Sequence, residues 1–163
     1  MCGLIGFSGK ESANMHKILH LLADNDSRGG HSVGVYMNGN MFKSTDMKGT
    51  GKSGDLRPIF AKENITDFGK LIIGHTRFAT QGEHSIKNAH PFQENEIIGA
   101  HNGVLSNYEE VGKKFGIEPT DVDSQMIFKV LADSPNKYLR LGMFSGSLNT
   151  LFTKSDGKLY VFR

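Results

Sequence analysis

The sequence is poor in cysteine, and this scarcity limits the folds and sites that it can form. Cys2 is the single cysteine among 163 residues, so an intramolecular disulfide framework is excluded. This usage suits a reducing compartment, and we expect a cytoplasmic protein. A lone cysteine is more often a small buried apolar residue than a nucleophile, so the rest of the sequence must decide the role of Cys2.

Long apolar runs and an excess of charge of one sign are also missing. No apolar stretch approaches the roughly 20 residues of a membrane span, and residues 1–20 lack the pattern of a signal peptide. Nineteen basic and seventeen acidic residues give a formal net charge of +2, which is too balanced to indicate binding to nucleic acid or to an anionic membrane. We expect one globular domain over residues 1–163.

Apolar periodicity and turn signals predict the elements of the first third of the chain. An amphipathic helix is predicted over residues 13–25, and its apolar face consists of Met15, Ile18, Leu19 and Leu22. Residues 33–37 and 41–44 flank Asn38-Gly39-Asn40 and are predicted to form a hairpin. Residues 46–58 are rich in Gly, Lys and Ser, which predicts an exposed loop.

The remaining chain alternates apolar runs with polar turns. Ser106 and Glu109 have the spacing of a capping box, which predicts that a helix begins there. Strands outnumber helices and hairpin signals recur, so we predict an α+β fold with antiparallel sheets. The predicted elements are strands over 71–75 and 97–101, helices over 107–115 and from residue 123, and strands over 147–153 and 158–162.

The position of Cys2 gives its thiol an unusual chemical option. Removal of Met1 would make Cys2 the amino terminus, and an α-amine has a reference pKa of about 7.7–8.0. Near neutral pH, part of this amine is unprotonated and can accept the thiol proton. Nucleophile and general base would then belong to one residue. Gly3 leaves the space beside the thiol open.

Three polar clusters supply what a cysteine acting on an amino-acid amide needs. Arg77 offers a guanidinium fork for a carboxylate, Asp123 a carboxylate for an ammonium group, and Asn102 with Gly103 two donors for an oxyanion. Each cluster also has a structural interpretation. Arg77 would be an exposed charge at a strand end, Asp123 a helix N-cap, and Asn102-Gly103 a type I′ hairpin turn.

Six motifs occur in order along essentially the whole chain. Together they resemble the class II glutamine amidotransferases of the N-terminal nucleophile hydrolase superfamily, in particular the glutaminase domain of glucosamine-6-phosphate synthases. The motifs are Cys2-Gly3, Arg28-Gly29 with Ser32 and Gly34, His75-Thr76-Arg77-Phe78-Ala79-Thr80, Asn88-Ala89-His90-Pro91, His101-Asn102-Gly103 with Asn107-Tyr108, and Asp121-Val122-Asp123.

The resemblance implies one glutaminase domain over residues 1–163, folded as a four-layer αββα sandwich of two antiparallel sheets between helices. It implies L-glutamine as the substrate, neither a metal nor a cofactor, and an ammonia acceptor on another chain, such as a synthase subunit acting in trans. The roles that it implies are Cys2 as nucleophile, Asn102 and Gly103 as oxyanion hole, Arg77 and Thr80 at the α-carboxylate, Asp123 at the α-ammonium, and Arg28 and His90 in support.

The sequence departs from the family pattern at a few positions near these motifs. Phe78 stands where the family usually has Trp, Gln81 where His is common, and His31 where Asp is usual before Ser32. None of these changes removes an implied catalytic group. Family domains also usually continue beyond the point that matches Arg163, so we expect a C-terminally short version of the fold.

Two other interpretations remain open from the sequence. The chain could be an inactive relative that keeps the motifs and serves as a binding or structural module, or the glutaminase part of a purine-pathway amidotransferase or a glutamate synthase. A zinc site is not indicated, because His75, His90 and His101 do not have a recognised ligand spacing. His75 and His101 are expected to pack and to form hydrogen bonds beneath the two motif turns.

Overall fold

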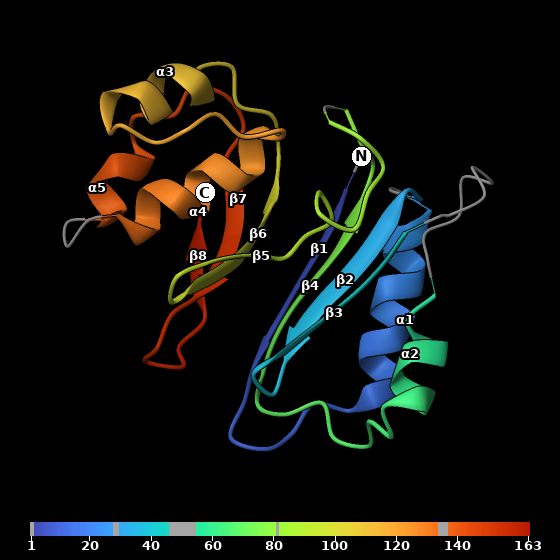
Figure 1. The fold of residues 1–163 in the computed structure, drawn as a ribbon. Helices are drawn as coiled ribbons and strands as arrows, with labels where there is room; N and C mark the ends of the chain where they lie inside the picture. Colours follow the sequence, from blue (N-terminus) through green and yellow to red (C-terminus); the bar gives the residue numbers. More distant parts are fainter. Residues whose placement is uncertain (1, 28–29, 46–54, 81, 134–136) are drawn as a thin grey trace.

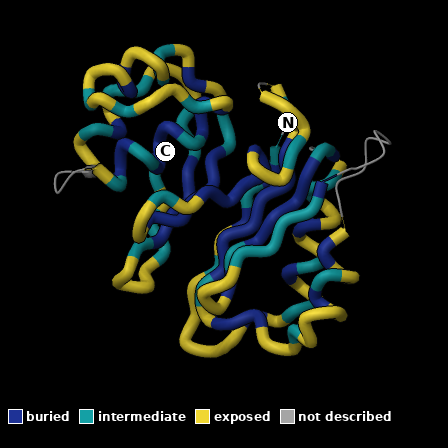
Figure 2. Tube along the Cα trace, viewed as in Figure 1, coloured by how far each residue is buried: buried dark blue, intermediate teal, exposed yellow. Residues whose placement is uncertain are grey.

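Two antiparallel sheets lie face to face at the centre of the molecule, and helices cover the outer face of each (Figure 1). The structure is a computed structural model that describes residues 2–27, 30–45, 55–80, 82–133 and 137–163. The layers are therefore helix, sheet, sheet and helix, as predicted. Figure 2 shows that the strands hold most of the buried residues, while the loops and outer helix faces are exposed.

The first sheet has the strand order β1-β4-β2-β3, and all its pairs are antiparallel. Helices α1 and α2 pack on its outer face (Figure 1). Its strands are β1 (Gly3–Ser8), β2 (Ser32–Met37), β3 (Asn40–Thr45) and β4 (Leu71–Arg77), and its helices are α1 (Met15–Asp26) and α2 (Arg57–Lys62).

The second sheet has the order β5-β6-β7-β8 and is also antiparallel. Three helices cover its outer face (Figure 1). Its strands are β5 (Phe92–Glu94), β6 (Ile97–Asn102), β7 (Asn149–Thr153) and β8 (Tyr160–Phe162), and its helices are α3 (Tyr108–Lys114), α4 (Asp123–Ala132) and α5 (Lys137–Leu141).

The predicted first helix and first hairpin are confirmed, and their local chemistry explains them. Asn14 caps α1, because its side-chain oxygen accepts the backbone N–H of Lys17 at 3.1 Å. The predicted inner face of α1 packs on the first sheet, with its residues buried or partly buried. Asn38 and Gly39 have φ values of 49° and 77°, the left-handed geometry that a two-residue β2–β3 turn requires.

Side-chain alternation along β4 separates two parts of the core. Ile72 points outward and belongs to the apolar cluster under α1. Ile73, the next residue, points inward and packs with Ala100 and Leu151 of the second sheet. Successive residues of a strand face opposite sides, so every second residue from Ile73 also faces the space between the sheets.

The same alternation places the predicted polar residues on the inner faces of three strands. Cys2 immediately precedes β1, Arg77 is the last residue of β4, and Asn102 is the last residue of β6. Each lies an even number of residues from an apolar side chain that packs between the sheets. The pairs that share a face are Cys2 with Leu4, Arg77 with Ile73, and Asn102 with Ala100.

Several local predictions were wrong. The capping box is not formed, because Ser106 Oγ donates to the carbonyl of Ser145 and Asn107 is the N-cap residue of α3. Strand β4 runs on to Arg77 through pairing with β1 and β2, although the predicted strand ended at residue 75. The short elements α2, β5 and α5 were not predicted. Residues 46–54 of the predicted loop lie outside the described residues. Residues 57 and 58, which were predicted to belong to this loop, form the start of α2.

Gly34 allows the segment that contains His90 to pack against β2. A Cβ atom at Gly34 would overlap the backbone carbonyl of His90. We expect Gly34→Ala to lower the free energy of unfolding by about 2–3 kcal/mol, because this backbone contact cannot relax by a change of rotamer. Chemical denaturation measures the loss. Gly142→Ala is the control, since its Cβ would meet only ordinary contacts; equal stability of both variants would contradict this packing.

Candidate active site

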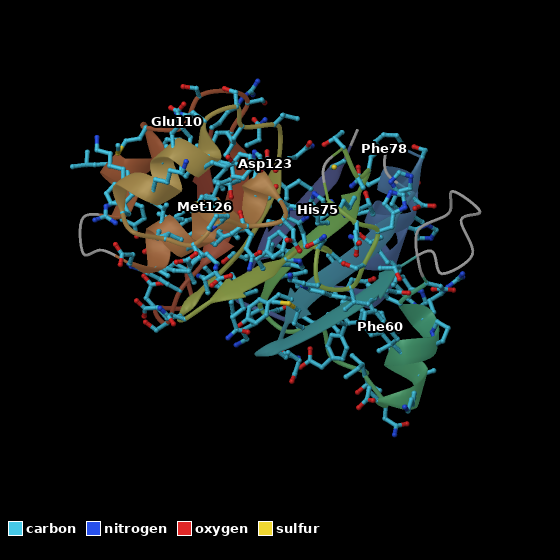
Figure 3. The ribbon with its side chains drawn as sticks, turned by 45° about the horizontal axis from the view of Figure 1, so that its top comes forward. Phe60, His75, Phe78, Glu110, Asp123 and Met126 are labelled. Carbon is cyan, nitrogen blue, oxygen red and sulfur yellow. The ribbon has the colours of Figure 1, made fainter. Side chains whose placement is uncertain are left out.

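Cys2 lies at one end of the space between the sheets, beside the end of β4. The pairing of Gly3 with Thr76 brings it next to the chain that follows Arg77. The backbone N–H of Phe78 donates to Cys2 Sγ at 3.2 Å, and Sγ lies 3.6 Å from the carbonyl oxygen of Phe78. The thiol is therefore held by a backbone group. Figure 3 shows Phe78 on the side of the first sheet and Asp123 on the side of the second.

Asn102 reaches Cys2 from the second sheet. Its Nδ2 donates to the carbonyl oxygen of Cys2 at 3.0 Å. Asn149 lies opposite Asn102 in β7, and its Nδ2 donates to the carbonyl of Asn102 at 3.0 Å and to Ser147 Oγ at 3.1 Å. Since Asn102 is paired with β7 within a strand, its interpretation as part of a hairpin turn is wrong.

The backbone after Asn102 is packed so closely that only glycine fits. A Cβ atom at Gly103 would overlap the carbonyl oxygen of Ser147. His101 fixes the same region, because its ring nitrogens lie 2.9 Å from that carbonyl and 2.9 Å from Ser124 Oγ. A carbonyl can only accept, so Nε2 carries the proton. Burial lowers the pKa of His101. Ser124 Oγ, next to Nδ1, also lies 3.2 Å from the Asp123 carboxylate, so His101, Ser124 and Asp123 form one buried polar cluster.

Arg77 is buried, with 4% of its surface exposed, so its interpretation as an exposed strand-end charge is wrong. Its Nη1 donates to the carbonyl oxygen of Glu83 at 3.1 Å. Burial lowers the pKa of Arg77, while nearby Cys2 and Asp123 act in the opposite direction. The guanidinium keeps its charge, because an arginine is not deprotonated in proteins.

Asp123 is also buried, and it faces the site from the first turn of α4. Its carboxylate accepts the backbone N–H of Leu105 at 2.8 Å and that of Ser124 at 2.7 Å. The N-cap position belongs to Val122, so the predicted N-cap interpretation of Asp123 is wrong. A carboxylate in the first turn still interacts favourably with the helix dipole. The backbone of Gly82, in the segment that follows β4, lies close to the side chain of Val122, the residue before Asp123.

The remaining predicted site residues have no hydrogen bond to Cys2, Arg77, Asn102 or Asp123 among the described residues. Thr80 is exposed in the turn after β4, and it makes no hydrogen bond within the described residues. Arg28 lies outside the described residues. His90 is buried between the sheets, where its ring packs on His75 with a centroid distance of 4.0 Å. Figure 3 labels His75, the partner of His90 in this contact. His90 is therefore a core residue that packs against the inner face of β4.

His75 and His90 have ring nitrogens without hydrogen-bond partners among the described residues. Burial lowers the pKa of His75 to about 3 and that of His90 well below its ordinary value. The backbone of His101 lies near the His75 ring and acts to raise its pKa, but neither ring nitrogen of His75 has a hydrogen-bond partner among the described residues. The expected hydrogen-bonding role of His75 is therefore wrong, whereas that of His101 is confirmed.

These lowered pKa values predict a loss of stability in acid. Below pH 6.5 the unfolded chain binds a proton at His75 that the folded chain excludes, so stability falls as the pH drops from about 6.5 towards about 3. Each such histidine contributes up to about 1.4 kcal/mol per pH unit. Denaturant unfolding from pH 7 to pH 4.5 measures the slope. His75→Leu should reduce it and the exposed control His16→Gln should not; equal slopes for all three proteins would contradict this account.

The two histidines of α1 lie away from this site. His16 and His20 line a cavity of about 580 Å³ on the α1 side of the first sheet, together with Asp55 and Arg57. Arg57 is paired with Asp55 at 2.8 Å. Within the described ranges, no group of three or more His, Cys, Asp or Glu side chains is arranged to hold a metal ion. In the same part of the chain, every helix is too short or too polar to cross a bilayer.

Sequence reasoning missed the groups that support the predicted residues. The backbone of Phe78 holds the Cys2 sulfur, and the carbonyl of Glu83 holds Arg77. Asn149 and Ser147 support Asn102 and His101 from a part of the chain that carries no recognised motif. Backbone groups have no sequence signature, and only the register of β6 on β7 could have revealed Asn149.

Comparisons with known proteins agree with this architecture. Residues 1–154 match the family model of the class-II glutamine amidotransferases. Curated relatives named glutamine–fructose-6-phosphate aminotransferase [isomerizing] include that of Lactiplantibacillus plantarum, 33% identical over 136 residues, and that of Tropheryma whipplei, 31% identical over 146 residues. The alignments cover 80% and 84% of this chain, but only 22% and 23% of the relatives.

Solved structures of related architecture confirm the predicted fold class. Glutamine phosphoribosylpyrophosphate amidotransferase from B. subtilis has a TM-score of 0.70 at 22% identity, covering 94% of this chain and 35% of its own. A glutamine aminotransferase class-II domain protein from Silicibacter pomeroyi has a TM-score of 0.52 at 15% identity, covering 100% and 76%. The family match over nearly the whole chain shows that this protein belongs to the class II glutamine amidotransferases.

Proposed function

We propose that this domain hydrolyses the side-chain amide of L-glutamine through a thioester on Cys2 and supplies ammonia to an acceptor site on another chain. The observation that carries this proposal is the convergence of Cys2, Arg77 and Asn102 at the inner ends of neighbouring strands. Phe78 N–H lies 3.2 Å from the Cys2 sulfur, and the Asn102 amide lies 3.0 Å from the Cys2 carbonyl. Membership of the class II amidotransferases supports the same reaction.

The reaction needs a base, and we propose that Cys2 provides its own. After removal of Met1, the α-amine of Cys2 accepts the thiol proton, and the thiolate attacks the amide carbon of glutamine. The carbonyl electrons move onto the oxygen, which is stabilised by the Asn102 amide and the Gly103 N–H. The α-ammonium returns the proton to the leaving nitrogen, so ammonia departs and a γ-glutamyl thioester remains. Water then cleaves the thioester and releases glutamate.

Substrate recognition is assigned to two buried charges of opposite sign. Arg77 would bind the α-carboxylate of glutamine, with Thr80 close to it in the chain, and Asp123 would bind the α-ammonium. Asp123 lies near enough to Arg77 to act on its pKa, which burial lowers and the Asp123 charge acts to raise. A buried pair of this kind favours a zwitterionic ligand, because each end of the ligand meets the opposite charge. We assign Arg28 and His90 supporting roles only.

Arg77→Lys tests this recognition most directly. Lysine keeps the positive charge but loses the fork that binds a carboxylate through two hydrogen bonds. We expect the KM for glutamine to rise at least about tenfold, with kcat changed much less. Steady-state glutamate production measures both constants. Arg57→Lys, at an exposed ion pair, is the control. An unchanged KM with a lowered melting temperature would make Arg77 a structural residue and remove it from the proposed site.

A further inference from the structure

His31, which immediately precedes β2, bonds to the chain on both sides of Phe78. Its backbone N–H donates to the carbonyl oxygen of Arg77 at 2.9 Å, just beyond the last pair of the β2–β4 ladder, Ser32 with Arg77. Its ring Nδ1 accepts the backbone N–H of Ala79 at 2.8 Å. One residue thus fixes the peptide groups before and after Phe78.

The Phe78 backbone is the group that contacts the proposed nucleophile. Its N–H lies 3.2 Å from Cys2 Sγ, so the direction of this N–H depends on how the 77–79 segment is held. The Phe78 side chain is 45% exposed, so burial alone does not hold it. Its ring stacks on His31 with a centroid distance of 4.7 Å and an interplanar angle of 26°. His31 therefore contacts this segment through a backbone bond, a side-chain bond and a ring contact.

We propose that His31 is a positioning residue that holds the Phe78 N–H against the sulfur of Cys2. A thiolate is the reactive form of cysteine, and a well-directed N–H donor stabilises it more than it stabilises the neutral thiol. This inference rests on the proposed role of Cys2 as the nucleophile. The property that matters is the hydrogen-bond acceptor at Nδ1, because Ala79 donates to it.

Substitutions can separate the acceptor from the rest of the ring. Asparagine places an amide oxygen close to the position of Nδ1, so His31→Asn retains an acceptor for Ala79 but loses the stacked ring. His31→Ala loses both. His84→Asn is the matched control, because the His84 ring also stacks on His31, at a centroid distance of 4.0 Å, and its removal leaves the bond to Ala79 intact.

The experiment measures the rate at which iodoacetamide alkylates Cys2 at pH 7 in the full chain, together with kcat and KM for glutamine. Loss of one hydrogen bond to a reactive sulfur predicts that His31→Ala lowers the alkylation rate and kcat by about three- to tenfold, with KM within about twofold. His31→Asn should restore most of the alkylation rate and most of kcat. His84→Asn should have the same alkylation rate and kcat as the unmodified protein. Thermal unfolding of each variant controls for a general loss of structure.

The outcomes separate this inference from the proposed function. If His31→Ala alkylates at the unmodified rate, or if His31→Asn is as impaired as His31→Ala, the positioning role is overturned. A fall that only follows a lowered melting temperature in both His31 variants also overturns it. If the chain does not turn over glutamine but alkylation shows the expected pattern, the proposed function fails and the positioning of the Cys2 thiol by His31 stands.

Discussion

Cys2→Ala should abolish glutamate release while leaving the fold intact. The proposed reaction passes through a bond to the Cys2 sulfur, and no other cysteine is present in the chain to replace it. Loss of a nucleophile in comparable covalent catalysis lowers kcat by more than about 10⁴-fold, and we expect an effect of that size. The Cys2 side chain is only partly buried and its sulfur contacts the Phe78 backbone, so its removal should change stability little.

Glutamate release by the purified variant, followed over hours, measures this loss. Circular dichroism and thermal unfolding establish that the variant is folded. Cys2→Ser is a useful companion, because it keeps a hydroxyl of similar size but lacks a thiol of comparable nucleophilicity. Turnover by Cys2→Ala at more than a few per cent of the unmodified rate would show that another group attacks the amide.

Asn102→Ala should lower kcat by about 10²–10³-fold with a much smaller change in KM. The Asn102 amide lies at Cys2, and we propose that it stabilises the oxyanion, which exists only after attack has begun. An interaction made only in the transition state affects kcat rather than substrate binding. Because Nδ2 also donates to the Cys2 carbonyl, some loss of local order is expected, and thermal unfolding should accompany the kinetics.

Asn40→Ala provides the comparison for Asn102. Asn40 is an exposed residue whose amide donates to the local carbonyl of Asn38 at 3.1 Å, far from Cys2 in the first hairpin. Its kinetics should remain those of the unmodified protein. If Asn102→Ala changed KM as strongly as kcat, Asn102 would be part of glutamine binding, and the oxyanion assignment would be wrong.

Much of the fold could be predicted because local patterns agreed with the final packing. The apolar face of α1 and the Asn38-Gly39 turn each carry a strong local signal. The extension of β4 to Arg77 carries none, because its polar end is held by pairing with two neighbouring strands. The α2 helix was missed because it is too short to show an apolar periodicity. It has only six residues and a proline at its start.

The candidate site was predictable in its side chains but not in its supports. Cys2, Arg77 and Asn102 belong to motifs, and strand alternation brings them to one place. The bond from the Phe78 backbone to Cys2 and the bond from Asn149 to Asn102 depend on strand register, which no motif specifies. His31 drew attention in the sequence only as a departure from the family pattern, and its contact with Ala79 became visible in the structure.

Intact-protein mass spectrometry of a reaction quenched with acid tests the central claim most directly. The chain is first shown to lack Met1 and to carry a free thiol, and it is then mixed with excess glutamine and quenched during turnover. We predict one γ-glutamyl group on Cys2, located by peptide mapping, released by hydroxylamine and absent from Cys2→Ala. Glutamate formation by the processed protein without any such adduct, or with an adduct at another residue, would contradict the proposed thioester on Cys2.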